Sequence, residues 1–274
     1  MPSGKREASS IIYIAPYDCA TIGFGELASA NVVGYTTKAV EAGKFYLVGV
    51  QFNDAADATK GKIDMNSLLS LSAEITPGTY DSDFAGAPEM QVLNAAGNGY
   101  NKYYYISDAT DDNDDPLGYN CWADMDGYEL KDADKLVMGK GFWFKSMNAG
   151  TITTAGEVSA VADSVVEFPA NQFFIMSNPF PKAFSFADVT TTGITTGTYD
   201  SDFAGASEIQ VLNAAATGYN KYYYISDATD ASDDYVNYNC WADMDGYILE
   251  GSQVDAGASF WIKGNAAGTM GFVK

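Results

Sequence analysis

The chain has 274 residues, of which 47% are hydrophobic, and a formal net charge of −21 at pH 7. This apolar content is enough for folded cores, while the negative charge disfavours nucleic acid and anionic membranes as partners. Histidine is absent, which excludes Ser-His-Asp and Cys-His catalysis and metal sites that need imidazole. Since no apolar run approaches the ~18 residues of a membrane-spanning helix, we expect no membrane insertion.

The first 30 residues differ from the rest of the chain. A mildly apolar run, Ile11–Ala15, is followed by Ala28-Ser-Ala30, whose small residues are typical of a signal-peptidase site. Pro16 and Asp18 interrupt the apolar core that a signal peptide needs. Residues 1–30 are therefore interpreted either as a degenerate signal segment or as an N-terminal extension.

From residue 31 onward, short β-branched and aromatic runs alternate with turns rich in Asp, Asn and Gly. Such runs are typical of strands, and many short strands with frequent turns predict an all-β fold of β-sandwich or barrel-like domains. The best exception is 63–71, which predicts one or two helical turns. The expected strands are 32–37, 44–52, 90–93, 102–106, 141–145 and 151–154, followed by 165–168, 172–176, 209–212, 221–225, 260–263 and 269–273.

Residues 79–130 return almost unchanged as residues 198–249. At an offset of 119 positions, 42 of the 52 aligned residues are identical. A self-match of this length predicts two tandem copies of one structural unit. We expect a first domain at 31–156 and a second at 157–274.

Three motifs follow one another in the first copy: an Asn-Val-Val-Gly-Tyr start at Asn31, a Gly-Lys-Gly-Phe-Trp strand at 139–143 and an Ala-Gly-Thr-Ile-Thr end at 149–153. This order resembles tandem β-rich modules of uncharacterised bacterial secreted and surface proteins, over about residues 31–274. The resemblance implies a β fold and a secreted or cell-surface location, and it implies no reaction. The second copy carries the match at 171–176, 260–263 and 267–269.

The three cysteines, Cys19, Cys121 and Cys240, cannot form a closed set of disulfides. Cys121 and Cys240 occupy equivalent places in the two copies, and equivalent places in tandem domains are normally far apart. We therefore expect small buried thiols rather than a bridge.

Acidic turns separate strands in both copies and are candidates for calcium. Carboxylates at positions i and i+2 of a tight loop can converge on one hard cation. No complete EF-hand loop is present, and Asp is also a common turn former with a solvated charge, so that alternative stays open. The candidate ligands are Asp81, Asp83, Asp124 and Asp126 in the first copy and Asp200, Asp202, Asp243 and Asp245 in the second.

A tyrosine-rich strand at 102–106 is the candidate ligand platform. Strand alternation puts Tyr103 and Tyr105 on one face, and tyrosine and tryptophan suit partly exposed contact with sugar rings. The alternative is ordinary packing in a β-sandwich, which we expect for Phe142-Trp143-Phe144 and its copy. The candidate platform comprises Tyr103, Tyr105 and Trp122, with Tyr222, Tyr224 and Trp241 in the second copy.

Together these features predict a non-enzymatic, exported surface, structural or adhesion-type protein without catalytic residues, and with either no cofactor or calcium. Its expected partners are polysaccharide, cell wall or other surface proteins. A carbohydrate- or cell-wall-binding module is the first alternative. A carboxylate-based glycan hydrolase is the second, since acidic pairs are plentiful, although no distinctive constellation marks them. The ligand and the oligomeric state are left open by the sequence.

Overall fold

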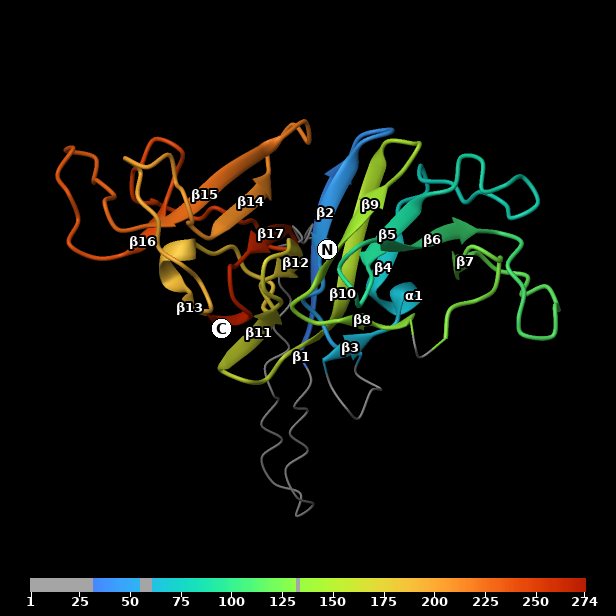
Figure 1. The fold of residues 1–274 in the computed structure, drawn as a ribbon. Coiled ribbons are helices and arrows are strands. Elements are labelled where there is room, and N and C mark those ends of the chain that lie inside the picture. The colour runs from blue at the N-terminus through green and yellow to red at the C-terminus, as the bar shows by residue number, and fades with distance from the viewer. Residues whose placement is uncertain (1–31, 55–60, 132–133) are drawn as a thin grey trace, which may run out of the picture.

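The computed structural model describes residues 32–54, 61–131 and 134–274. The segment 1–30, with its predicted signal or extension, and Cys19 lie outside the described residues. The regular structure is almost entirely antiparallel β, which confirms the predicted all-β class. Figure 1 shows two wings that meet at the centre of the molecule, one from each half of the chain.

The first half contains a three-stranded sheet of order β1-β10-β4 and a five-stranded sheet of order β2-β9-β5-β6-β7. Strand β10 extends two residues past the predicted boundary at 156/157, because Glu157 and Val158 still pair with β1. The strands of the first sheet are β1 (Val32–Val40), β10 (Gly150–Val158) and β4 (Leu69–Leu71), and those of the second are β2 (Phe45–Gly49), β9 (Gly141–Lys145), β5 (Glu89–Leu93), β6 (Tyr100–Ile106) and β7 (Cys121–Ala123).

A short strand pair, β3 (Lys62–Ile63) with β8 (Leu136–Val137), and one helical turn complete this half. The helix α1 (Met65–Leu68) begins after Asp64, whose carboxylate accepts hydrogen bonds from the backbone N–H groups of residues 66 and 67. The predicted helical turn at 63–71 is therefore shorter than expected, because Leu69–Leu71 pair with β10 instead.

The second half has the same sheet orders, β11-β18-β13 and β12-β17-β14-β15-β16. A single 3-10 turn, η2 (Phe186–Asp188), precedes β13. The strands are β11 (Asp163–Phe168), β18 (Gly268–Val273) and β13 (Thr190–Thr192), then β12 (Phe174–Ser177), β17 (Ser259–Lys263), β14 (Glu208–Leu212), β15 (Tyr219–Ile225) and β16 (Cys240–Ala242).

Each half has its core between its two sheets, as in a β-sandwich. In the first half, Val40, Leu69 and Ile152 from the three-stranded sheet meet apolar residues of the five-stranded sheet such as Phe142 and Phe144. The second core has the same construction, and its largest members include Phe168, Met270, Phe272, Met176, Phe260 and Ile262.

The two halves contact each other through matching surfaces. The Ser177 N–H donates to the Gly139 carbonyl at 2.8 Å, and the Gly49 N–H donates to the Gly257 carbonyl, also at 2.8 Å. Gly49 pairs with Gly141 in the first half as Ser177 pairs with Ser259 in the second. Gly139 and Gly257, which precede Gly141 and Ser259 by two residues, both have a left-handed φ, 84° and 81°. Contacts that occur in such reciprocal pairs are those of two units related by a two-fold axis.

Candidate functional site

The residues predicted to form an aromatic platform lie against the two cores. Trp122 is 0% exposed, Tyr103 is 5% exposed and Trp241 is 4% exposed. Tyr105 packs on Trp122 with ring centroids 5.6 Å apart, and both Tyr222 and Tyr224 pack against the second core. The face of β6 chosen for the platform is thus the core face, which corrects the prediction of an exposed surface there.

The opposite face of each five-stranded sheet is turned away from its own core. Cross-strand register places Trp143 between Leu47 and Gln91 on this face, and Lys145 between Phe45 and Glu89. Phe142 and Phe144 are fully buried as expected, whereas Trp143 is half-buried and points to the other side of the strand. The prediction that Trp143 belongs to the core is therefore wrong.

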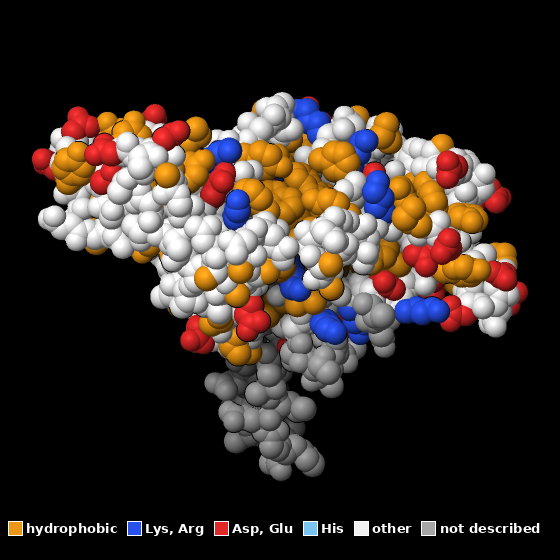
Figure 2. Space-filling model, in the orientation of Figure 1, with side chains coloured by type: hydrophobic (Ala, Val, Ile, Leu, Met, Phe, Trp, Pro, Cys, Tyr) orange, Lys and Arg blue, Asp and Glu red, His pale blue; other side chains and the backbone are white. Residues whose placement is uncertain are grey.

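Four aromatic side chains from these outer faces meet where the halves join, and we call them the central aromatic surface: Phe45, Trp143, Phe173 and Trp261. The ring centroids of Trp143 and Trp261 are 6.4 Å apart, with the planes tilted by 51°. Phe45 lies 6.0 Å from Trp143, and Phe173 lies 6.2 Å from Trp261, both edge-on. Figure 2 shows hydrophobic side chains gathered between the wings, over the region of β2, β9 and β14 in Figure 1.

Charged and amide side chains border this surface on both sheets. Lys145 lies over the Phe45 ring, 5.1 Å from its centroid. The Lys102 ammonium is 3.1 Å from a Glu89 oxygen, and the Gln91 amide donates to the same carboxylate at 2.7 Å. The hydrogen bond to Glu89 and its charge raise the pKa of Lys102, so this lysine stays protonated. The second half repeats the arrangement with Lys263 over Phe173 at 5.6 Å, Lys221 on Glu208 at 3.3 Å and Gln210 on Glu208 at 2.7 Å.

Tyr100 and Tyr219, in equivalent places on the two halves, stand at the edge of the surface and are 38% and 37% exposed. Burial raises the pKa of Tyr219, and a hydrogen bond from Trp261 opposes that rise. The site therefore offers half-exposed aromatic rings for stacking, surrounded by hydroxyl, amide, carboxylate and ammonium groups for hydrogen bonding.

The sequence itself carries a signal for this face. Lys145 is two residues after Trp143 on the same strand face, while Phe142 and Phe144 share the other. A lysine in step with a tryptophan indicates the face that reaches solvent, because lysine is almost never fully buried.

The predicted calcium ligands lie in turns toward the outer ends of the wings. The Asp124 carboxylate accepts the backbone N–H groups of Asp126 at 2.9 Å and Tyr128 at 3.0 Å. Asp81 donates its N–H to the Asp108 carboxylate at 3.1 Å, and Asp83 is exposed with φ 55°. Asp243 and Asp245 repeat the first pattern, and Asp200 and Asp202 repeat the second.

These hydrogen bonds are those of turn formers. Over residues 32–54, 61–131 and 134–274, no group of three or more acidic or cysteine side chains is placed to hold a metal ion. Calcium binding stays a prediction.

Some predicted residues do meet in an open groove of the second half. Tyr222, Asp243 and Asp245 line this groove, whose volume is about 540 Å³. Asp124 lines the equivalent groove of the first half, about 440 Å³, which also holds an ion pair between Lys131 and Asp112 at 2.6 Å. The two grooves differ in chemistry, since the second contains apolar residues such as Ile248 and Leu249. The central aromatic surface, by contrast, has the same chemistry in both halves.

The fold and this surface define a class: an antiparallel all-β protein with an aromatic surface between two like halves. Comparison with protein-family models, with curated proteins and with solved structures finds no match to this chain. The resemblance to bacterial secreted and surface modules therefore stays a prediction. Within the described part of the chain, no helix is long and apolar enough to cross a membrane.

Proposed function

We propose that this protein is a non-enzymatic, exported adhesion-type protein that binds polysaccharide through the central aromatic surface. The observation that carries the proposal is the pair Trp143 and Trp261, half-buried and 6.4 Å apart where the two halves meet. The apolar face of a sugar ring stacks on such side chains, while its hydroxyl groups need hydrogen-bonding partners close by. Gln91, Gln210 and the lysines along both borders supply those partners.

The charge around this surface favours an acidic polysaccharide. Four lysines (Lys102, Lys145, Lys221 and Lys263) and two glutamates (Glu89 and Glu208) border it. This border is locally cationic in a chain whose net charge is −21. Since local cationic groups attract anionic ligands, uronic-acid or sulfated sugars fit better than neutral ones. No observation favours the glycan hydrolase, because Glu89 and Glu208 are each paired with a lysine of the same sheet.

The test is isothermal titration of the full chain with polygalacturonate and with dextran, which is neutral. Trp143→Ala and Trp261→Ala should each weaken polygalacturonate binding by about tenfold or more, which corresponds to about 1.4 kcal/mol. Binding should also weaken as salt is raised, because charge attraction is screened. Tyr235→Ala is the matched control, since Tyr235 is 67% exposed, pairs with Thr229 outside the surface and should change nothing.

Thermal unfolding of each variant separates lost binding from lost folding. If both folded tryptophan variants bind polygalacturonate as tightly as the parent chain, the surface is not the binding site. If the parent chain binds neither polymer, the proposed function is refuted.

A further inference from the structure

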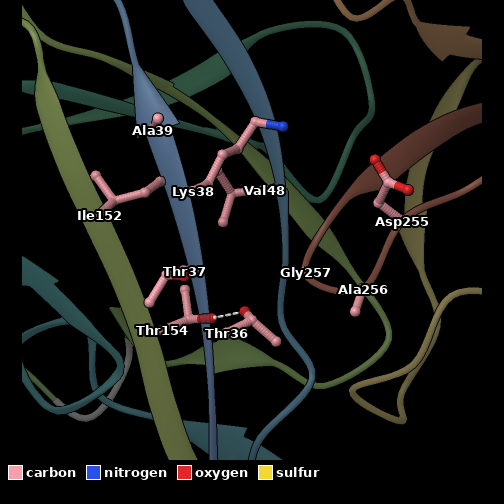
Figure 3. Close-up of a pocket in the computed structure, with 10 residues that line it drawn as sticks. All are labelled: Thr36, Thr37, Lys38, Ala39, Val48, Ile152, Thr154, Asp255, Ala256 and Gly257. Carbon is pink, nitrogen blue, oxygen red and sulfur yellow. Dashed lines mark hydrogen bonds between the residues drawn. The ribbon is translucent and has the colours of Figure 1, made fainter. Parts of the chain in front are cut away.

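A second feature lies between the halves, away from the central aromatic surface. It is a cleft of about 260 Å³ between β1 and the segment 255–257 of the second half. This volume corresponds to roughly nine water molecules or a ligand with a similar number of non-hydrogen atoms. Figure 3 shows Lys38 and Asp255 on opposite sides of it, with Thr36 and Thr154 joined by a hydrogen bond on the β1 side. That bond is 2.6 Å long.

Both walls of this cleft have equivalent positions on the other side of the two-fold axis. Lys38 pairs with Ile152 in β10 as Val166 pairs with Met270 in β18, so Lys38 and Val166 occupy equivalent places. Val166 is 7% exposed and packs against Gly139. A Cβ added to Gly139 would lie 2.5 Å from the Cγ2 of Val166. On that side of the two-fold axis, an apolar contact fills the space.

Asp255 has an apolar counterpart too. It precedes Gly257 by two residues, as Val137 precedes Gly139, and the two glycines make the reciprocal hydrogen bonds between the halves. At the equivalent positions, valines (Val166 of the second half and Val137 of the first) stand where the cleft has Lys38 and Asp255. Of the two equivalent places, the cleft is the one with the charges.

The two charges are placed to act on a ligand rather than to neutralise each other. Among the described residues no ion pair joins Lys38 to Asp255, and the Lys38 ammonium instead lies 5.5 Å from the centroid of the Tyr46 ring. Burial lowers the pKa of Lys38, and the charge of Asp255 only partly opposes this. A half-buried ammonium without a bound anion is unfavourable, and an anionic ligand group would relieve that cost.

A further donor lies next to the cleft wall. The Gln51 Oε1 accepts the Gly257 N–H at 2.8 Å, and Gly257 lines the cleft. The Nε2 of the same side chain is buried and has no hydrogen-bond partner among the described residues.

We propose that the cleft binds a free α-amino acid with a small side chain, its carboxylate on Lys38 and its ammonium on Asp255. Such a zwitterion carries both charges within a few bonds, so it can pair with Lys38 and Asp255 at the same time. An anion alone would engage only the half-buried Lys38, and a cation alone would engage only the exposed Asp255. The threonine hydroxyls accept or donate hydrogen bonds as the ligand requires.

The experiment titrates the full chain with glycine, alanine and serine, and separately with acetate and ethylammonium. We expect saturable binding of one amino acid per chain, with acetate and ethylammonium at least about tenfold weaker. Lys38→Met and Asp255→Asn should each weaken amino-acid binding by at least about tenfold. Lys182→Met, a lysine outside the cleft, is the control and should bind like the parent chain.

The double variant Lys38→Val with Asp255→Val introduces the residue type found at the two equivalent positions, Val166 of the second half and Val137 of the first. It should abolish binding while thermal unfolding and polygalacturonate binding stay unchanged, which separates this site from the central aromatic surface. The proposal is overturned if none of the three amino acids binds, if acetate binds as tightly as alanine, or if folded Asp255→Asn keeps full affinity.

Discussion

Gly141 lies against residues of the second half, so adding one methyl group there tests the interface directly. A Cβ on this residue would lie 2.4 Å from the Ser259 Cβ and 2.7 Å from the Ile175 Cγ2. Neither atom is the end of a flexible side chain, and therefore a strand must shift. Overpacking of this kind costs about 1–3 kcal/mol, and we expect Gly141→Ala to lower the Tm by about 2–10 °C.

A second substitution decides whether that cost arises between the halves. Ser259→Gly removes the two nearest atoms that the new methyl group would meet and, of the three nearest, leaves only the Ile175 Cγ2. The Ser259 Oγ has no hydrogen-bond partner among the described residues. A glycine in a strand costs about 0.5–1 kcal/mol by itself. Combined with Gly141→Ala, however, Ser259→Gly should recover at least half of the lost Tm, because residues in contact are coupled.

Differential scanning calorimetry of the parent chain, the two single variants and the double variant completes the cycle. Gly218→Ala is the control, since its added Cβ would meet only the Asn213 amide at 3.4 Å. We expect that control to stay within about 0.5 kcal/mol of the parent. A Gly141→Ala chain that melts within a degree of the parent, or a double variant that melts no higher than Gly141→Ala, would refute the proposed packing.

Three further measurements test other parts of the structure. Burial, with the Asp134 charge adding to it, raises the pKa of Tyr103 to about 12. The contribution of the neutral Tyr103 to stability is therefore present below pH 10 and lost from pH 10 to 12. Tyr103→Phe should flatten that part of the Tm–pH profile, and an unchanged profile would contradict the raised pKa. Burial also raises the pKa of the Cys121 thiol to about 11, so mass spectrometry after thiol labelling should find it modified more slowly than the less buried Cys240, and equal rates would count against the fold around it. The Tm in calcium and in chelator tests the predicted calcium ligands, such as Asp124: we expect a rise of several degrees in calcium if they hold an ion, and the same Tm in both would contradict the prediction.

The all-β class is predictable because its signals are local. Aromatic runs such as 102–106 form equivalent strands in both halves, and the Asp124 and Asp243 turns repeat the same hydrogen bond. The order of strands in the sheets is not local. Strand β9 lies between β2 and β5, although Phe45 and Lys145, which pair, are separated by most of the first half. Such pairings depend on tertiary contacts that a pattern of alternation does not specify.

The site was harder to predict because alternation defines two faces of a strand without saying which one is core. Tyrosines occupy both faces of β6, so the choice of Tyr103 over Tyr104 rested on no physical difference. Tyr104 in fact stacks on Phe84, with ring centroids 4.2 Å apart, on the outer face. The run Phe142-Trp143-Phe144 predicts ordinary core packing for all three side chains. The contact of Trp143 with Trp261 lies between the halves, and nothing in one copy of a repeat indicates how it docks on the other.

The pseudo-two-fold axis explains why two kinds of site lie between the halves. Side chains of the central aromatic surface are the same in both halves, as Trp143 and Trp261 or Gln91 and Gln210 show. A surface with the same chemistry on each side of an axis suits a polymer whose repeating units offer the same groups again and again. The cleft exists where the halves differ. Lys38 lines it, whereas Val166, at the equivalent position of the second half, packs against the first half and fills that space. A cleft with a positive charge on one side and a negative charge on the other suits a small molecule that carries both charges. Because the equivalent place holds Val166 and Val137 instead of such charges, the chain is expected to bind one such molecule.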